Sequence, residues 1–167
     1  MIERTKEPLA ITPFYGRQRD GTNAFIYQRF LVPYFTNFTG KAIFLDASDM
    51  LMLADIDDLN KLFDPSKAVQ VVKHVYQTKH RKKYVGTAME AANELHRFSW
   101  LPEALIGELP KSWNVLVGEQ DHMSAKIAHY TLGIPEFDNY KDCNYSEDWF
   151  KTKSRMLNGL INIKDTG

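Results

Sequence analysis

The order of apolar and polar residues along the chain predicts three strands, KAIFLDA at 41–47, KAVQVVKHVY at 67–76 and AKIAHYTL at 125–132. The first run is almost wholly apolar, which is typical of a strand in a sheet that is covered on both faces. The second run is rich in valine, which favours strands, but it also carries polar residues that include His74. We therefore expect one end or face of the second strand to meet solvent or a ligand.

Helical spacing is visible in three other segments. Apolar residues at 25, 26, 30, 31, 34 and 35 follow Asn23, a residue suited to cap a helix, and Pro33 is expected to end or kink this helix. ADIDDLNKLF at 54–63 predicts a short helix whose acidic first turn complements the helix dipole. A further helix is expected from about Ser146, because two acidic residues again precede an apolar stripe.

Composition and the order of the predicted elements support one domain, of the α/β or α+β type, that spans residues 1–167. The length suits a single compact domain, the apolar fraction of 44% is ordinary, and we find no internal repeat or linker. Lys plus Arg (21) equals Asp plus Glu (21), so no overall charge attracts the chain to nucleic acid or to an anionic membrane. The single cysteine, Cys143, excludes an intrachain disulfide framework, and no signal peptide or transmembrane segment is evident. These features predict a cytoplasmic protein.

Candidate chemistry lies at the ends of two predicted strands. Asp46 and Asp49 follow the first strand and His129 lies near the end of the third, where ligands gather in open α/β sheets. Divalent cations such as Mg²⁺ and Mn²⁺ prefer carboxylate oxygens, and Mn²⁺ tolerates an imidazole nitrogen better than Mg²⁺ does. The alternative interpretation is that the aspartates cap a turn and that the histidine is structural.

Four segments then carry a resemblance to a known family. In order along the chain, they are YQRFLVPYF at 27–35, AIFLDASDMLMLADIDDL at 42–59, LPKSWNVL at 109–116 and HYTLGIPEF at 129–137. This series resembles the landmarks of the retaining, glycogenin-like glycosyltransferases, which use nucleotide-sugar donors. The resemblance implies a Rossmann-like GT-A fold, in which a mixed sheet is flanked by helices.

The resemblance also implies roles for particular residues. Asp46, Asp49 and His129 would bind Mn²⁺ (or Mg²⁺), which in that family holds the diphosphate of the donor. Arg29 would face the donor pocket, and the backbone of Gly133 would lie close to phosphate. The partners would be a nucleotide-sugar donor and an unknown sugar, lipid or protein acceptor.

The chain departs from the family pattern in several places. Two residues separate Asp46 from Asp49 where the family has one, so Asp46 either reaches the metal through a bulged turn or serves the ribose or the turn. Gly133 follows His129 by four positions where the family usually has three, and IPEF at 134–137 stands where a phosphate-binding lysine is usual. Arg29 or a lysine of the basic run at 79–83 would compensate for that lysine.

Two family segments are expected to be missing from this chain. The sequence begins after the usual first strand, and nothing between GTAMEAAN (86–93) and ELHRFSWL (94–101) corresponds to a strand that lines the sugar pocket. A second hypothesis is therefore a catalytically degenerate glycosyltransferase-like domain that binds a sugar or a partner. A third, nucleic-acid binding by the basic and aromatic segment 73–84, is disfavoured by the zero net charge.

Overall fold

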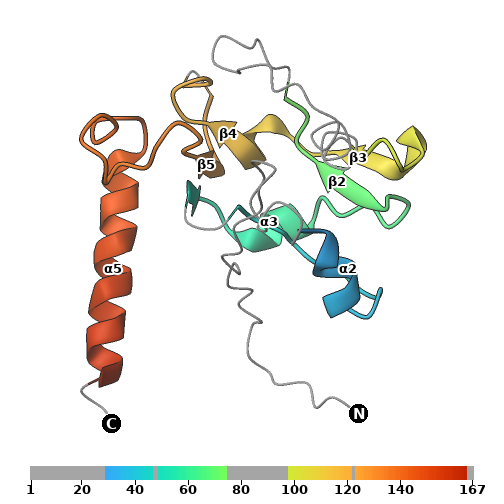
Figure 1. Cartoon of the computed structure of the whole chain (residues 1–167), viewed down its shortest axis with the longest axis horizontal. Coiled ribbons are helices and arrows are strands. Elements are labelled where there is room, and N and C mark those ends of the chain that lie inside the picture. Colours follow the sequence, from blue (N-terminus) through green and yellow to red (C-terminus); the bar gives the residue numbers. More distant parts are fainter. Residues whose placement is uncertain (1–28, 47–48, 75–97, 122, 165–167) are drawn as a thin grey trace, which may run out of the picture. The chain divides into compact units, whose positions relative to one another are not determined.

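The computed structural model describes residues 29–46, 49–74, 98–121 and 123–164 (Figure 1). Residues up to Leu45, together with 85–90, form one compact unit, and Asp46–Tyr84 with Ala91–Gly167 form a second. The elements in chain order are η1 (Arg29–Leu31), α2 (Val32–Phe35), β1 (Met50–Met52), α3 (Ile56–Asn60), β2 (Val69–Val71), η3 (Glu103–Leu105), β3 (Ile106–Glu108), η4 (Lys111–Asn114), β4 (Val115–Leu116), β5 (Ile127–His129) and α5 (Ser146–Lys164). The described part is thus a small mixed α/β structure.

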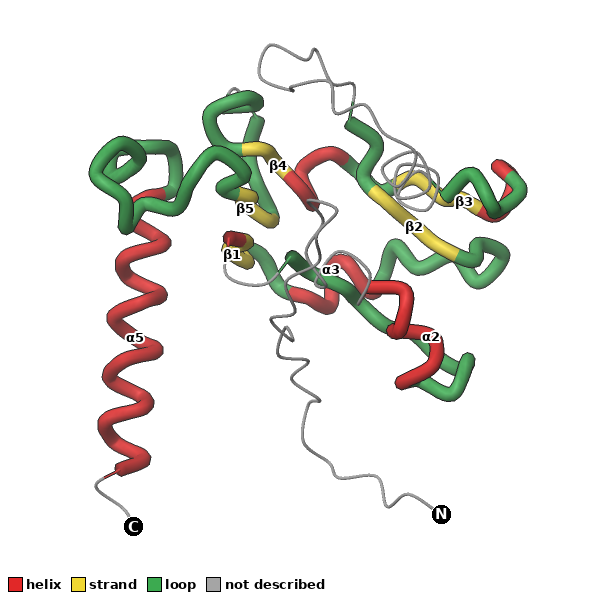
Figure 2. Tube along the Cα trace, viewed as in Figure 1, coloured by secondary structure: helices red, strands yellow, loops and turns green. Residues whose placement is uncertain are grey.

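A three-stranded mixed sheet organises the second unit, in the strand order β1-β5-β4 (Figure 2). The central strand β5 pairs antiparallel with β1 and parallel with β4, so that Met50 and Leu116 both lie opposite His129. Because side chains alternate between the faces of a strand, Ile127 and His129 share one face of β5 and Ala128 lies on the other. The candidate site residue His129 and the buried Ala128 therefore lie on opposite faces of β5.

Apolar side chains are buried on both faces of β5. Ile127 and Leu116, on the His129 face, are 2% and 3% exposed. On the Ala128 face, Leu51 of β1, Ala128 of β5, and Val117 and Tyr130, which directly follow β4 and β5, form a cluster of buried side chains. Half-buried apolar side chains pack against it, among them Trp149 of α5. Removing this apolar area from water is the main favourable contribution to folding, so α5 is fastened to the sheet chiefly by its first turns.

Two tyrosines tie the end of β5 to the start of α5. The hydroxyl of Tyr130 donates a hydrogen bond to the carbonyl of Tyr145 (3.0 Å), and burial raises the pKa of Tyr130 well above its usual value. The hydroxyl of Tyr145 donates to the carbonyl of Met123 (3.0 Å) and accepts from the N–H of Ala125 (3.0 Å). Tyr145 has a left-handed backbone with φ of 63°, a conformation that such contacts must stabilise.

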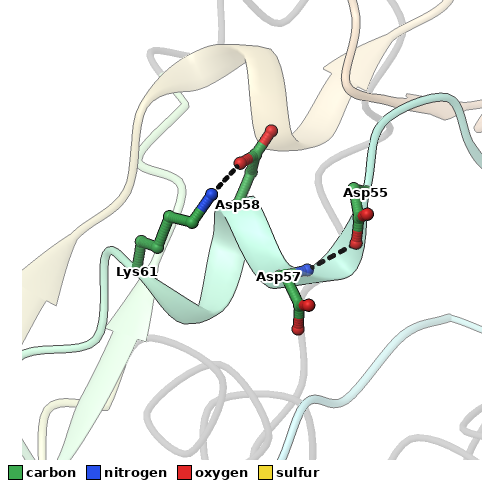
Figure 3. A network of polar contacts seen from close by, with 4 residues as sticks. All are labelled: Asp55, Asp57, Asp58 and Lys61. Carbon is green, nitrogen blue, oxygen red and sulfur yellow. Dashed lines mark hydrogen bonds and ion pairs between the residues drawn. The ribbon is translucent and has the colours of Figure 1, made fainter.

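Helix α3 shows why its segment folds as the sequence predicts. The Asp55 side chain caps the helix by accepting a hydrogen bond from the N–H of Asp57 (2.9 Å), and the Lys61 ammonium lies 2.7 Å from the carboxylate of Asp58 (Figure 3). The ion pair is exposed to solvent and contributes little, whereas a cap of this kind is worth about 1 kcal/mol. Helix α3 therefore confirms the centre of the acidic helix predicted at 54–63.

A second, two-stranded sheet joins β2 and β3 in parallel, with Gln70 opposite Gly107. The Gln70 amide accepts from the N–H of Asp64 (2.8 Å) and donates to the carbonyl of Leu62 (2.9 Å), so it holds the segment after α3 against β2. A Cβ atom at Gly107 would lie 2.8 Å from Cγ of Gln70 and 2.9 Å from Cγ of Lys67. Glycine at this position lets the two strands approach.

The predicted strands at 67–76 and 125–132 are confirmed in their centres by β2 and β5, but the predicted strand at 41–47 is wrong. Residues 41–46 have no strand pairing, and Ile43 is 49% exposed. The strand lies further along, at β1, where antiparallel pairing with β5 is available. An apolar run becomes a strand only where a neighbouring strand accepts its backbone hydrogen bonds.

The two remaining helix predictions have different outcomes. The helix expected from about Ser146 is confirmed by α5, with Glu147 and Asp148 in its first turn. In the other predicted helix Pro33 lies in the first turn of α2 and not at its end, and the predicted cap Asn23 lies outside the described residues. The first turn tolerates proline because its N–H groups have no partner within the helix.

Replacing Tyr145 by phenylalanine tests the tyrosine connection. The variant leaves the Ala125 N–H and the Met123 carbonyl without the hydroxyl, and we expect a loss of about 1–3 kcal/mol in the free energy of unfolding. Chemical denaturation followed by tryptophan fluorescence measures this loss. Tyr34→Phe is the matched control, because Tyr34 is 67% exposed, and it should change stability by less than about 0.5 kcal/mol. Equal effects in the two variants would contradict the role of Tyr145.

Candidate functional site

Antiparallel pairing of β1 and β5 brings Asp49 to His129. Asp49 directly precedes β1, and its carbonyl accepts a hydrogen bond from the N–H of Tyr130 (2.8 Å). Its backbone lies in a tight turn and not in the strand. Its side chain therefore need not follow the rule that successive side chains of a strand point to opposite faces of the sheet. The carboxylate Oδ2 of Asp49 lies 3.4 Å from Nε2 of His129.

This arrangement corrects the expected position of the aspartates in the sheet. Asp49 lies at the start of a strand, because β1 follows it and no strand precedes it in residues 41–46. Since β1 runs antiparallel to β5, the start of β1 lies at the same sheet edge as the end of β5. The acidic residue and the histidine therefore meet by a different topology from the one predicted.

The second ring nitrogen of His129 also has a partner. Nδ1 lies 2.9 Å from Oδ1 of Asn114, the last residue of η4. The His129 side chain is only 11% exposed, whereas that of Asp49 is 38% exposed. The imidazole is thus held between a carboxylate that is open to solvent and an uncharged amide.

The spacing of Asp49 and His129 fits a shared divalent cation. Two ligand atoms bound at about 2.1 Å lie about 3.0 Å apart in an octahedron and about 3.4 Å apart in a tetrahedron. The observed 3.4 Å equals the tetrahedral separation and is about 0.4 Å longer than the octahedral one, so the two side chains would move slightly closer around a six-coordinate ion. It also exceeds the usual length of a charge-assisted hydrogen bond, about 2.7–2.9 Å. Within the described ranges no three His, Cys, Asp or Glu side chains form a group able to hold a metal ion. The described residues would therefore supply two ligands to such a site, Asp49 and His129.

Asp46 adjoins the site through its backbone. Its N–H donates to the sulfur of Met50 (3.1 Å), the residue opposite His129 in β1, so Asp46 lies close to the start of this strand. Residues 47 and 48, which link the two aspartates, lie outside the described residues. A direct role of the Asp46 carboxylate in metal or ribose binding stays a prediction.

Gly133 has a structural task that the sequence did not predict. Its N–H donates to the carbonyl of Tyr130 (3.1 Å), and a Cβ at this position would lie 2.3 Å from the ring of Tyr140. Nearby Glu136 of the IPEF segment forms an ion pair with Lys153 of α5. The proposed phosphate contact of Gly133 stays a prediction, although its N–H is already engaged in a turn.

Arg29 belongs to the first compact unit, whereas Asp49 and His129 belong to the second. Its guanidinium lies over the ring of Phe44, 5.2 Å from the ring centre, in a cation–π contact within the first unit. Arg29 also begins η1. Its expected role at the donor pocket stays a prediction.

A second histidine lies close to the site. Nδ1 of His74, just after β2, is 3.4 Å from the amide nitrogen of Gln120, whose oxygen accepts from the N–H of Leu116 (3.1 Å). That backbone contact fixes the orientation of the amide, so Gln120 donates to His74. Burial lowers the pKa of His74, and the nearby His129 and Lys111 act in the same direction while Glu119 opposes them.

Asn114 and Gln120 were missed by sequence reasoning. Asn114 lies in the LPKSWNVL segment, which was recognised as a landmark, but an amide carries no chemical signature of its own. His74 had a partial signal, because it interrupts a valine-rich strand. The basic run at 79–83 and the junction of residues 93 and 94, where a family strand is expected to be missing, lie outside the described residues.

One comparison with known proteins gives a clear match. The chain is 32% identical over 198 aligned positions to Protein CDI of Arabidopsis thaliana, and the match covers 89% of this chain and 76% of that relative. The chain belongs to the Protein CDI family. The alignment with Protein CDI has more positions than the 167 residues of this chain, so it includes positions of the relative that have no counterpart here. No protein-family profile matches the chain, and no solved structure matches it significantly.

The described residues also bear on two partners that the sequence disfavours, a membrane and a nucleic acid. No helix among them is both long and apolar enough to cross a membrane. In the segment proposed as a nucleic-acid contact, Lys73 lies 3.9 Å from the carboxylate of Glu108, and residues 75–84 lie outside the described part.

The lowered pKa of His74 predicts a pH dependence of stability. Below about pH 6.5 the unfolded chain binds a proton that the folded chain resists, so the free energy of unfolding falls as the pH falls, by at most about 1.4 kcal/mol per pH unit for this group. In His74→Gln the decline between about pH 7 and pH 5 should be shallower. Urea denaturation at several pH values measures both slopes. At about pH 8, where histidine is neutral, the two proteins should differ by a constant amount, and equal slopes at low pH would contradict the prediction.

Proposed function

We propose that the chain is a glycosyltransferase that binds a nucleoside-diphosphate sugar through a divalent cation and transfers the sugar, with retention, to an unidentified acceptor. The observation that carries this proposal is the meeting of Asp49 and His129 at one sheet edge, with Oδ2 and Nε2 3.4 Å apart. These are two of the three positions that the resemblance to glycogenin-like transferases implies as ligands, the third being Asp46. They lie far apart in the chain, so their meeting is independent support.

The chemistry of the two ligands suits Mn²⁺ or Mg²⁺. One carboxylate oxygen and one imidazole nitrogen leave most positions of a six-coordinate ion open to water and phosphate oxygens, as is usual where a cation is bound together with a substrate phosphate. The exposed fraction of Asp49, 38%, leaves its carboxylate accessible from solvent. A bound cation would neutralise the charge that develops on the departing nucleoside diphosphate.

Other features support this proposal. Asp46 would add an oxygen ligand or contact the ribose, and the part of Arg29 rests on the resemblance alone. The mixed α/β sheet is compatible with a shortened GT-A fold of the Rossmann-like type. The length of the alignment with Protein CDI supports a chain from which segments of its relatives are missing. The cytoplasm is the proposed location, on the sequence features given above.

A second candidate function is a degenerate glycosyltransferase-like domain that binds its ligand without turnover. The engaged N–H of Gly133 and the pairing of Glu136 with Lys153 favour it, because both lie where the family places phosphate contacts. The leaving group would then have less positive charge around it. The two candidates share a binding site and differ in catalysis.

Metal-dependent nucleotide binding tests the shared part. Isothermal titration with a panel of nucleoside-diphosphate sugars should show binding that is at least about tenfold tighter with Mn²⁺ than with EDTA, because the cation bridges protein and diphosphate. Asp49→Ala and His129→Ala should each abolish this difference.

The matched control is Asp138→Ala, which removes an exposed aspartate in a turn of the same unit and should bind as the wild type does. Circular dichroism establishes that each variant is folded. Binding that ignores Mn²⁺, or ligand variants that bind normally, would refute both candidates. Release of free nucleoside diphosphate with transfer of the sugar supports the enzyme, and metal-dependent binding without turnover supports the degenerate domain.

A further inference from the structure

We propose that Asn114 is a positioning residue that fixes the tautomer of His129, so that Nε2 presents its lone pair to the cation. This inference rests on the proposed function, because it concerns how the same site holds its metal. Asn114 is not one of the candidate site residues that the sequence pattern suggested. The structure assigns its role through a single short contact.

The contact determines where the imidazole proton lies. A neutral imidazole has one N–H, and an amide oxygen only accepts hydrogen bonds. With Oδ1 of Asn114 at 2.9 Å, the proton lies on Nδ1, and the lone pair of Nε2 then faces Oδ2 of Asp49 at 3.4 Å. Two acceptors that face each other repel unless a proton or a cation lies between them. The metal-free site is therefore prepared for a positive ion.

The opposite orientation of the Asn114 amide predicts the other tautomer. The amide nitrogen would then donate to Nδ1, and the proton would lie on Nε2 and point to Asp49 across 3.4 Å, which is longer than the usual range of about 2.7–3.2 Å. The structure places Oδ1, and not the amide nitrogen, 2.9 Å from Nδ1, and the inference rests on this placement.

The frame around Asn114 keeps the contact in place. Trp113, its neighbour in η4, is 3% exposed, and the ammonium of Lys126 lies 4.8 Å from the centre of its ring. The N–H of Lys126 donates to the carbonyl of Ser112 (2.7 Å), and the N–H of Val117 donates to the carbonyl of His129 (2.9 Å). The backbone on both sides of Asn114 is thus hydrogen-bonded to β5 or to the residue just before it, which places the Asn114 side chain beside His129.

A histidine that binds a metal generally makes a second contact of this kind. The ring nitrogen that does not bind the metal donates to an oxygen, which orients the ring and raises the basicity of the other nitrogen. A neutral amide provides the acceptor without adding negative charge, so it leaves the charge of the site to Asp49 and to the ligand. An aspartate at position 114 would accept the same proton more strongly, and a leucine would accept none.

Three proteins test the inference: the wild type, Asn114→Asp and Asn114→Leu. Binding of Mn²⁺ is followed by electron paramagnetic resonance of the free ion, with Mn²⁺ alone and with inorganic pyrophosphate. We expect Asn114→Leu to weaken Mn²⁺ binding about 10- to 100-fold, and Asn114→Asp to stay within about threefold of the wild type or to bind more tightly. Thermal unfolding establishes that the variants are folded.

Nitrogen-15 spectra of the imidazole rings at about pH 8.5, where neutral histidine predominates, give a measurement that does not depend on metal binding. The His129 signal is assigned by comparison with His129→Gln. We expect the Nδ1–H tautomer in the wild type and in Asn114→Asp, and its loss in Asn114→Leu.

The outcomes separate this inference from the proposed function. A wild type with the Nε2–H tautomer overturns the inference even if Mn²⁺ binds, and so does an Asn114→Leu variant that keeps the wild-type affinity for Mn²⁺. A wild type with the Nδ1–H tautomer that fails to bind Mn²⁺ with pyrophosphate overturns the proposed function, and the role of Asn114 toward a metal with it. The wild-type spectrum decides the tautomer even if a variant does not fold.

Discussion

The antiparallel pairing of β1 with β5 is the interaction on which the rest of the second unit depends. It has only three residue pairs, yet it places Leu51 beside Ala128 in the core and Met50 opposite His129 at the site. A shift of the pairing by one residue would exchange the two faces of the sheet and remove both arrangements at once. Packing and candidate chemistry are thus set by one register.

The two faces of β5 differ in what they bury. On one side, Ala128 joins the buried cluster, and Tyr130, which follows the strand, joins it too and is tied to the start of α5 by its hydroxyl. On the other side, His129 is nearly buried beside the apolar Ile127, and its ring nitrogens face the polar side chains of Asp49 and Asn114. Burial makes a polar side chain costly unless its partners are well placed. Asp49 and Asn114 are the partners that offset this cost at His129.

Local signals were enough to predict some of these elements. The acidic residues in the first turns of α3 and α5 and the apolar spacing of β5 act within a few residues, so their sequence patterns suffice. β1 was missed, because Met50–Met52 is no more apolar than Ile43–Leu45 and only the partner strand distinguishes them. Asp49 and His129, two of the three expected ligands, lie together in the structure, although the expectation placed Asp49 after a strand that is absent, and their role as ligands stays a prediction. The role of Asn114 could not be predicted from the sequence, because only the folded structure shows that its amide contacts His129.

The antiparallel geometry has a thermodynamic consequence. Asp49 and His129 belong to segments that are distant in the sequence, so closing the long intervening loop must be compensated before their strands gain any pairing energy. A cation held by both would bind only the folded chain and would stabilise it in proportion to its concentration, by about 2.7 kcal/mol at one hundred times its dissociation constant. Where this cation is abundant, it would therefore help to hold β1 against β5, in addition to their three backbone pairs. Under the proposed function, ligand supply and folding of this unit form one linked equilibrium.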